Sequence, residues 1–210
     1  MVIIDNFAVF EGIDGSGTST QIDILGEFFQ KNRFSLPPFY KTFEPTNGSI
    51  GKLIRSALRK EISFAPATIA MLFAADRHEH LFGPEGIVER CKQGELVVSD
   101  RYLPSSLVYQ GITCGNEFPD LINRDFPGPE LLLYFDIDPE IAMKRISGRG
   151  QAEIFEYLEF QILVRERYKA LLPRLSEQGI RVENIDASAP PEEVAREVWA
   201  AIEKMPIIKK

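Results

Sequence analysis

Five short runs of hydrophobic residues recur along the chain, each rich in aromatic or branched side chains. Their lengths suit strands, and the central runs are apolar on both faces of the pleat. Strands of that kind lie inside a sheet that is covered on both sides. The predicted strands are Phe7–Glu11, Phe39–Glu44, Glu95–Asp100, Leu131–Asp138 and Arg181–Ala187.

The segments between these runs carry apolar residues at the spacing of amphipathic helices. We predict a helix over Thr20–Asn32, helical structure over 65–93 with a break near Gly83-Pro84, a helix start at Asp138-Pro139-Glu140, and a last helix after Pro190-Pro191. The residues expected on the buried faces of the first and last helices are Ile22, Leu25, Phe28, Phe29, Val194, Val198 and Ile202. Strands that alternate with helices predict a three-layer α/β/α fold around a five-stranded, mainly parallel sheet.

Composition narrows the class of protein. The chain has 210 residues, 44% of them hydrophobic, and a formal net charge of −7. This length suits a single domain over 1–210, and the acidic balance argues against a protein that holds long nucleic acid. The N-terminal region lacks the features of a signal peptide, and no apolar stretch approaches the ~18–20 residues of a membrane span. Cys91 and Cys114 are too few for a disulfide scaffold, so we expect ordinary thiols in a soluble cytoplasmic protein.

A glycine-rich stretch, EGIDGSGTST at residues 11–20, connects the first predicted strand to the first predicted helix. It is similar to the phosphate-binding pattern G-x-x-x-x-G-K-[ST], with Gly12 and Gly17 at the glycine positions and Ser19 at the metal-binding hydroxyl. Glycines there let backbone N–H groups curl around an anion at a helix N-terminus. A plain connection is the alternative interpretation, and Thr18, which stands where the pattern has lysine, weakens the match.

Two further stretches carry side chains that could bind a ligand. In LFAADRHEHL, Phe73 and Arg77 share a helix face and can stack on and hydrogen-bond a pyrimidine, although such a phenylalanine is more often core. In SDRYLPSSLVYQG, Asp100 and Arg101 lie at the carboxyl end of a buried strand, where open α/β sheets bind ligands. An ion pair with a structural arginine is the alternative for Asp100.

Four stretches together, in this order, resemble the motifs of thymidylate kinases: EGIDGSGTSTQ, FEPTNGSIGKLIR, LFAADRHEHL and SDRYLPSSLVYQG. The resemblance extends from the first strand to the NIDAS segment near the C-terminus. It implies the P-loop kinase form of the α/β/α fold, with a short lid over 145–157, and transfer of the γ-phosphoryl group of ATP to dTMP with Mg²⁺. It also implies a homodimer, to which the apolar face of 67–81 would contribute.

The same resemblance implies roles for individual residues. The ATP-binding set would be Gly12, Gly15, Ser16, Gly17, Thr18, Ser19, Thr20 and Arg145, with Arg145 against the adenine. Ser19 and Asp100 would hold Mg²⁺, and the catalytic residues would be Asp14, Arg101 and Arg149. The dTMP-binding set would be Asp14, Glu44, Pro45, Arg55, Phe73, Arg77, Arg101, Ser106, Tyr109, Gln110 and Phe155. In that set, Phe73 and Arg77 would bind the base, while Tyr109 would crowd the 2′ position of the sugar.

Some of these residues also have ordinary structural interpretations. Asp14 can cap a helix, Arg55 can be a surface arginine, and the basic residues of the lid can form a solvated patch. His78 and His80 have no acidic or cysteine partner at metal-ligand spacing, so we interpret both as polar surface residues.

Two departures from the family pattern bear on function. Thr18 replaces the loop lysine, and Phe43 stands where many family members have arginine. The sequence is therefore compatible with three functions: a dTMP kinase, a non-catalytic nucleotide-binding homologue, and a kinase of another pyrimidine deoxynucleotide. The retained donor-side and acceptor-side residues favour the first. One cationic donor can contribute ~10²–10³ in rate, so Thr18 predicts a slower kinase that depends more on Mg²⁺ and on lid closure.

Overall fold

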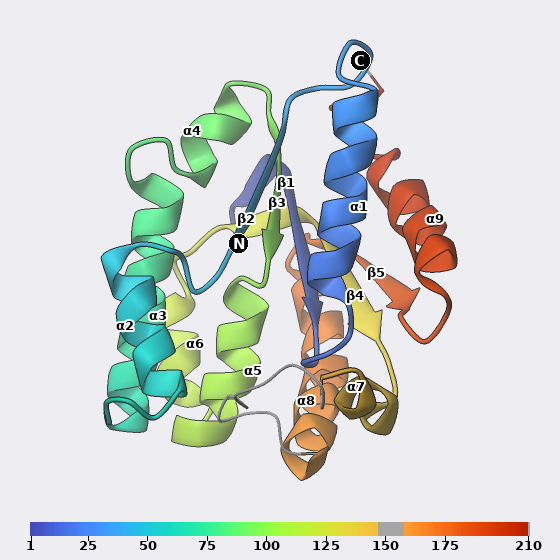
Figure 1. The fold of residues 1–210 in the computed structure, drawn as a ribbon. Coiled ribbons are helices and arrows are strands. Elements are labelled where there is room, and N and C mark those ends of the chain that lie inside the picture. Colours follow the sequence, from blue (N-terminus) through green and yellow to red (C-terminus); the bar gives the residue numbers. More distant parts are fainter. Residues whose placement is uncertain (147–157, 210) are drawn as a thin grey trace.

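The computed structural model describes residues 1–146 and 158–209. Within them, five parallel strands form one sheet in the order β2-β3-β1-β4-β5 (Figure 1). The strands are β1 (Ile3–Gly12), β2 (Phe39–Phe43), β3 (Leu96–Asp100), β4 (Gly128–Asp136) and β5 (Arg181–Asp186). The predicted five-stranded parallel sheet is thus confirmed. Because β1 is the central strand, the glycine-rich loop after it lies in the middle of the sheet's carboxyl edge.

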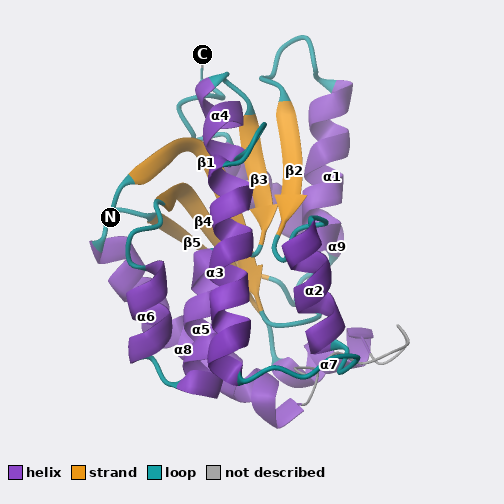
Figure 2. Ribbon diagram, turned by 90° about the vertical axis from the view of Figure 1, so that its left-hand side faces the viewer, coloured by secondary structure: helices purple, strands orange, loops and turns teal. Residues whose placement is uncertain are grey.

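Helices cover both faces of this sheet, as Figure 2 shows from the side. On one face α1 (Thr18–Lys31) packs beside α9 (Pro191–Ile202). The other face is covered by α4 (Ile87–Lys92), α5 (Leu103–Cys114) and α8 (Leu158–Glu177), with α3 (Pro66–Phe82) packed on α4 and α5. The remaining described helices are α2 (Ser49–Leu58), α6 (Glu117–Asn123) and α7 (Pro139–Ile146).

The strands begin earlier than predicted at two places. β1 starts at Ile3, and β4 starts at Gly128, because the first residues of these strands pair with one another. The register between them shifts after Ile4, and Asn6 has a left-handed φ of 65° while its N–H donates to Glu130. This irregularity interrupts the alternation of apolar residues, so the sequence pattern alone did not reveal the extension.

The predicted break in the long helical segment is confirmed, since α3 ends at Phe82 and α4 begins at Ile87. The prediction for the buried face of α1 is wrong at Phe28, which is 39% exposed and packs its ring 4.5 Å from Trp199 on α9. The short helix α6 and the full extent of α8 were not predicted, because α6 has only seven residues and α8 contains a proline, Pro173, in its interior.

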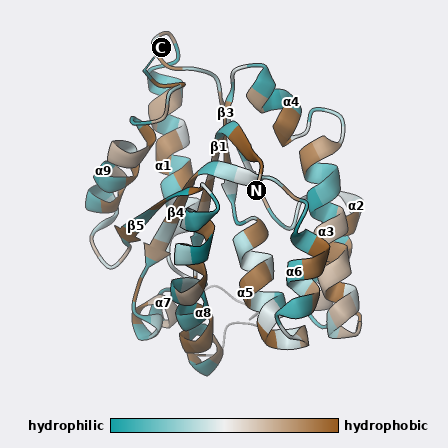
Figure 3. Cartoon of the chain, turned by 180° about the vertical axis from the view of Figure 1, so that it is seen from behind, coloured by the Kyte–Doolittle hydropathy of each residue, from teal (hydrophilic) through white to brown (hydrophobic). Residues whose placement is uncertain are grey.

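The core lies on both sides of the sheet, where the central strands bury nearly all of their side chains. Figure 3 shows the surrounding helices divided between hydrophilic and hydrophobic residues, as expected for helices with one face against a sheet. Among the helices in the described residues, none combines the length and the apolar character that a membrane crossing requires. Cys91 and Cys114 are both free thiols, and burial raises the pKa of Cys91 to about 12.

Candidate active site

The glycine-rich loop joins the end of β1 to the start of α1. Gly15 and Gly17 have φ values of 81° and 93°, a left-handed conformation that favours glycine. A Cβ on Gly15 would lie 2.5 Å from the carbonyl oxygen of Ala142 on α7, so the loop is also closely packed. Gly17 is the N-cap residue of α1, and the described hydrogen bonds of the Asp14 carboxylate come from the side chains of Arg101, Gln161 and Tyr109, so Asp14 does not cap this helix in the structure.

Ser19 and Asp100 meet at the carboxyl edge of the sheet. The Ser19 hydroxyl donates to Asp100 Oδ2 at 2.5 Å, which connects the first turn of α1 to the end of β3. The other oxygen, Oδ1, is buried and has no hydrogen-bond partner among the described residues, nor is Asp100 in an ion pair there. A hydroxyl beside an unpartnered carboxylate oxygen fits a hard divalent cation that takes its other ligands from phosphate and water.

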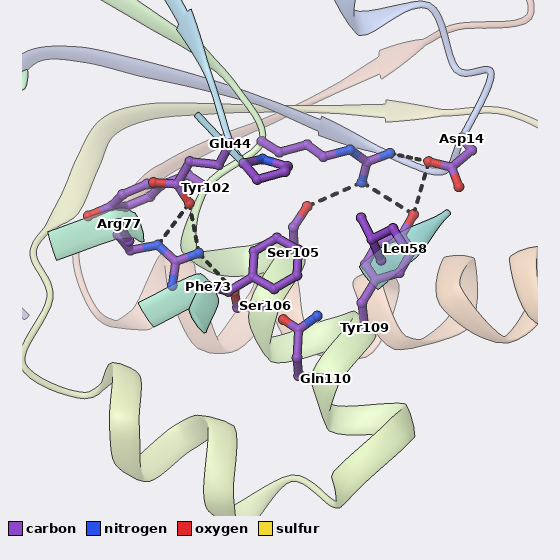
Figure 4. Close-up of a pocket in the computed structure, with 12 residues that line it drawn as sticks. Asp14, Glu44, Leu58, Phe73, Arg77, Tyr102, Ser105, Ser106, Tyr109 and Gln110 are labelled. Carbon is purple, nitrogen blue, oxygen red and sulfur yellow. Dashed lines mark hydrogen bonds and ion pairs between the residues drawn. The ribbon is translucent and has the colours of Figure 1, made fainter. Parts of the chain in front are cut away.

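Asp14 is the centre of a second polar cluster, at the mouth of the loop. One of its carboxylate oxygens accepts a hydrogen bond from Arg101 and the other accepts one from Gln161 at 2.9 Å. Arg101 also donates to the hydroxyl oxygens of Ser105 and Tyr109, each at 3.2 Å (Figure 4). Its φ of 69° is unusual for a residue with a side chain and turns the backbone between β3 and α5. Burial raises the pKa of Tyr109, whose hydroxyl therefore stays protonated.

Glu11, the last residue before the loop glycine, is completely buried. Its carboxylate accepts hydrogen bonds from the Tyr102 N–H, from the N–H and hydroxyl of Ser105, and from the Tyr168 hydroxyl. Burial raises the pKa of Glu11, and the charge of Arg101 together with these hydrogen bonds opposes that rise. Glu11 thereby fixes the start of α5 to β1. An acidic residue at the end of an otherwise apolar strand was the available signal, and sequence reasoning gave it no role.

Arg77 lies in a buried network of its own. The Nε and Nη2 atoms donate to Glu44 Oε2 at 3.0 and 2.8 Å, and Nη2 also donates to Ser106 at 2.8 Å. Nη1 donates to Asn123 on α6, so four of the five N–H donors of the guanidinium have acceptors in the described part of the chain. Sequence reasoning missed Asn123, because the short helix that carries it was not predicted.

The prediction that His80 is a surface residue is wrong, although His78 is exposed as predicted. The side chain of His80 is only 9% exposed. Its Nδ1 lies 3.2 Å from Glu44 Oε1 and its Nε2 lies 2.6 Å from the Thr42 hydroxyl. With Nδ1 protonated, His80 donates to Glu44 and accepts from Thr42, so it joins the end of β2 to the Arg77 network.

Side chains from the Asp14 cluster and from the Arg77 network line one pocket, which we call the Arg77 pocket (Figure 4). Its lining is Asp14, Glu44, Pro45, Leu58, Phe73, Arg77, Arg101, Tyr102, Ser105, Ser106, Tyr109 and Gln110. The structure therefore brings together every described residue of the predicted dTMP-binding set except Arg55, and adds Leu58, Tyr102 and Ser105. Within the pocket Phe73 is half-buried, and Gln110 Oε1 is buried without a partner among the described residues.

Arg55 is not part of the lining of the Arg77 pocket. Its guanidinium donates to the carbonyl oxygens of Pro45 and Thr46 and to the side chain of Asn47. These contacts hold the loop after β2 in place and leave Arg55 only partly exposed, while its contact with dTMP stays a prediction.

A second hollow, which we call the Lys41 cleft, adjoins the Arg77 pocket and has a volume of about 410 Å³. Its lining is Ser19, Ile22, Asp23, Lys41, Thr42, Phe43, Glu44, Asp100 and Arg101. The cleft therefore contains both predicted metal-binding residues. Phe43, which is 42% exposed, forms part of the wall of this cleft.

Arg145 lies on the other side of the loop, at the end of α7. Its Nη1 donates to the carbonyl oxygen of Ala187 at 3.1 Å and is 4.0 Å from the position that a Cβ on Gly17 would take. Arg145 thus connects the glycine-rich loop to the segment that follows β5. The predicted lid residues Arg149 and Phe155 lie outside the described residues.

Comparison with known proteins agrees with this geometry. The family model for thymidylate kinase matches residues 10–198. A putative thymidylate kinase of Treponema pallidum is 43% identical over 190 residues, which is 89% of each chain. A probable thymidylate kinase of Pyrobaculum aerophilum is 44% identical over 200 residues, covering 95% of this chain and 97% of that relative. A thymidylate kinase of Geobacillus is 38% identical over 207 residues, covering 93% and 95%. The chain therefore belongs to the thymidylate kinase family.

Proposed function

We propose that the protein transfers the γ-phosphoryl group of ATP to dTMP, forming dTDP and ADP with the help of Mg²⁺. The observation that carries this proposal is the Arg77 pocket, which opens beside the loop and contains an aromatic face, two arginines and an unpartnered amide oxygen. The family membership and the names of the relatives support the same substrates.

The pocket has the chemistry to bind a pyrimidine base. The face of Phe73 offers a stacking surface, and Arg77 keeps one Nη1 hydrogen that has no acceptor among the described residues. A carbonyl oxygen of the base can accept that hydrogen. The Gln110 carboxamide, with Oε1 unpartnered and buried in the lining, can pair with the polar edge of the same base.

The opposite end of the pocket suits a sugar phosphate. Arg101 can bind the acceptor phosphate while Asp14, already hydrogen-bonded to Arg101 and Gln161, approaches a sugar hydroxyl. Tyr109 is 6% exposed and lies beside Arg101, where its ring would crowd a 2′-hydroxyl. We therefore propose deoxyribose as the preferred sugar.

The donor side is the glycine-rich loop with Ser19, Asp100 and Arg145. Backbone N–H groups of residues 12–20 would bind the phosphates of ATP, and Arg145 would pack on its adenine. Ser19 and Asp100 would hold Mg²⁺, which when bound neutralises charge on the phosphate oxygens. We propose the lid at 145–157 and its Arg149 as further donor-side elements, and 1–210 as one domain.

Two other functions compete with this proposal, namely a nucleotide-binding homologue without catalysis and a kinase of another pyrimidine deoxynucleotide. A coupled assay of ADP release across dTMP, dUMP, dCMP, dGMP and AMP separates the three. We expect the highest kcat/KM with dTMP. Turnover that is fastest with dCMP would select the other kinase, and no turnover with any acceptor would select the non-catalytic homologue. A ribonucleotide counterpart of dTMP in the same panel tests the proposed role of Tyr109.

We also propose that the protein forms a homodimer through α3. Met71 and Phe82 on this helix are 50% and 51% exposed, and they lie about three helical turns apart, so both side chains are on one face. Light scattering after size-exclusion chromatography should give twice the mass of the chain, and Met71→Lys combined with Phe82→Lys should give the monomer.

A further inference from the structure

The glycine-rich loop lacks its usual cation. In the general pattern a lysine at the position of Thr18 reaches the β- and γ-phosphates of the nucleotide. A threonine hydroxyl can donate a hydrogen bond but brings no charge. On the understanding that ATP is the donor, as proposed above, we propose that Lys41 of β2 supplies this missing charge to the terminal phosphate.

Lys41 lies on the correct face of the sheet. Neighbouring side chains of a strand alternate between faces, and Thr42 points to α3, where it meets His80. Lys41 and Phe43 therefore point to the α1 side, and both line the cleft that contains Ser19 and Asp100. Phe43 pairs with Asp100 and Lys41 pairs with Val98. Along the strand direction, the backbone of Lys41 is therefore two residues, or about 7 Å, before the level of Asp100.

The ammonium group is already close to the first turn of α1. Lys41 Nζ lies 2.7 Å from Asp23 Oδ1. Asp23 comes four residues after Ser19 on α1, so the two side chains are neighbours on one face of the helix. A change of side-chain rotamer, with no movement of the backbone, can carry the charge from Asp23 toward a phosphate at Ser19.

Releasing Lys41 costs little. Its side chain and that of Asp23 are 62% and 63% exposed, and such exposed ion pairs contribute little to stability. Arg101, another cation in the lining of the cleft, is instead held by Asp14 and two hydroxyl groups. A triphosphate carries far more negative charge than one carboxylate, so it competes effectively with Asp23 for the lysine. The competing interpretation is a simple ion pair between β2 and α1.

Nucleotide binding separates these interpretations without relying on turnover. Calorimetry with Mg²⁺ would compare a non-hydrolysable ATP analogue with ADP in the wild type, in Lys41→Met and in Lys31→Met. Lys31 is the matched control, because it pairs with Glu27 of α1 at the far end of the helix and is 75% exposed. We expect Lys41→Met to weaken the analogue about ten-fold or more and ADP less than about three-fold. Equal effects on the two nucleotides, or an effect no larger than that of Lys31→Met, would overturn the proposal.

A double-mutant cycle with Thr18 tests the exchange of roles. Lys41→Met should lower kcat by about 10²-fold with the KM for dTMP unchanged, since the charge acts on the transferring phosphoryl group. Thr18→Lys in the Lys41→Met background should restore most of that loss, and Lys41→Arg should retain activity. Rescue must appear both in kcat and in the affinity for the ATP analogue. If Thr18→Lys leaves either one at the level of Lys41→Met, Lys41 does not replace the loop lysine. Absence of dTMP turnover in the wild type would contradict the proposed function, while the binding comparison would still decide the role of Lys41.

Discussion

The Arg77 pocket and the Lys41 cleft share Glu44 and Arg101 in their walls, yet their charges are held in opposite ways. In the pocket, the Arg77–Glu44 ion pair is 1% and 3% exposed and is completed by buried hydrogen bonds. In the cleft, the Lys41–Asp23 pair is mostly exposed. Buried networks fix a geometry before the ligand arrives, whereas an exposed cation can follow a group that moves. The fixed network of the pocket suits the proposed selection of a base, and the exposed lysine of the cleft suits the proposed transfer of a phosphoryl group.

The largest effect is expected from Arg77→Ala, which removes the fixed charge of the pocket. It leaves Glu44 as a buried charge without its main partner, which should cost about 3–5 kcal/mol of unfolding free energy. Binding of dTMP should weaken by about 2–4 kcal/mol, because a buried base edge loses its charged partner, while binding of ATP stays near the wild-type value. Chemical denaturation and calorimetry measure the two effects, with His78→Ala as the control on the exposed face of α3. Equal losses for dTMP and ATP would show that Arg77 has only a structural role.

Asp100→Asn should affect the cleft alone. The amide keeps the shape of the side chain and can still accept the hydrogen bond from Ser19, but it removes the charge that we propose for the metal. We expect kcat to fall by about 10²-fold or more, and half-maximal activity to need more Mg²⁺, with dTMP affinity unchanged. Asp125→Asn, at a carboxylate that is 90% exposed, is the control. A loss of dTMP affinity comparable to the loss of rate would instead place Asp100 in the pocket network.

A smaller effect should follow from changing His80, which supports the pocket from behind. His80→Phe removes the hydrogen bonds to Glu44 and Thr42 and should weaken dTMP binding by about 0.5–1.5 kcal/mol. We expect the KM for dTMP to rise while kcat and the KM for ATP hold, and His80→Gln or His80→Asn to recover part of the loss by restoring one hydrogen bond. His78→Phe serves as the matched control. If the melting temperature falls with no selective change in dTMP binding, His80 contributes packing only.

Local patterns in the sequence encode the strands, which the apolar runs located, and most of the lining of the Arg77 pocket, which four motifs located. Local patterns do not encode hydrogen-bond partners that only the fold brings together. His80 meets Thr42 and Glu44 from 38 and 36 positions away, and Arg77 meets Asn123 from 46 positions away. Lys41 likewise has no signal in its own segment, because its meaning depends on the register of β2 against β3.

The smallest expected effect belongs to Thr18→Lys in the otherwise wild-type protein. From the loop alone, an added lysine should raise kcat by about 10²-fold or more, because the loop would regain a charge on the transferring phosphoryl group. If Lys41 already supplies that charge, the second cation gains little, and kcat should rise by less than about three-fold. Steady-state kinetics at saturating dTMP and a range of Mg²⁺ concentrations measures the difference. Thr18→Ser, which keeps the hydroxyl and adds no charge, controls for disturbance of the loop. A large rise with Thr18→Lys would mean that the cleft leaves the terminal phosphate short of charge, and that the donor side of this kinase is attenuated as the sequence predicts.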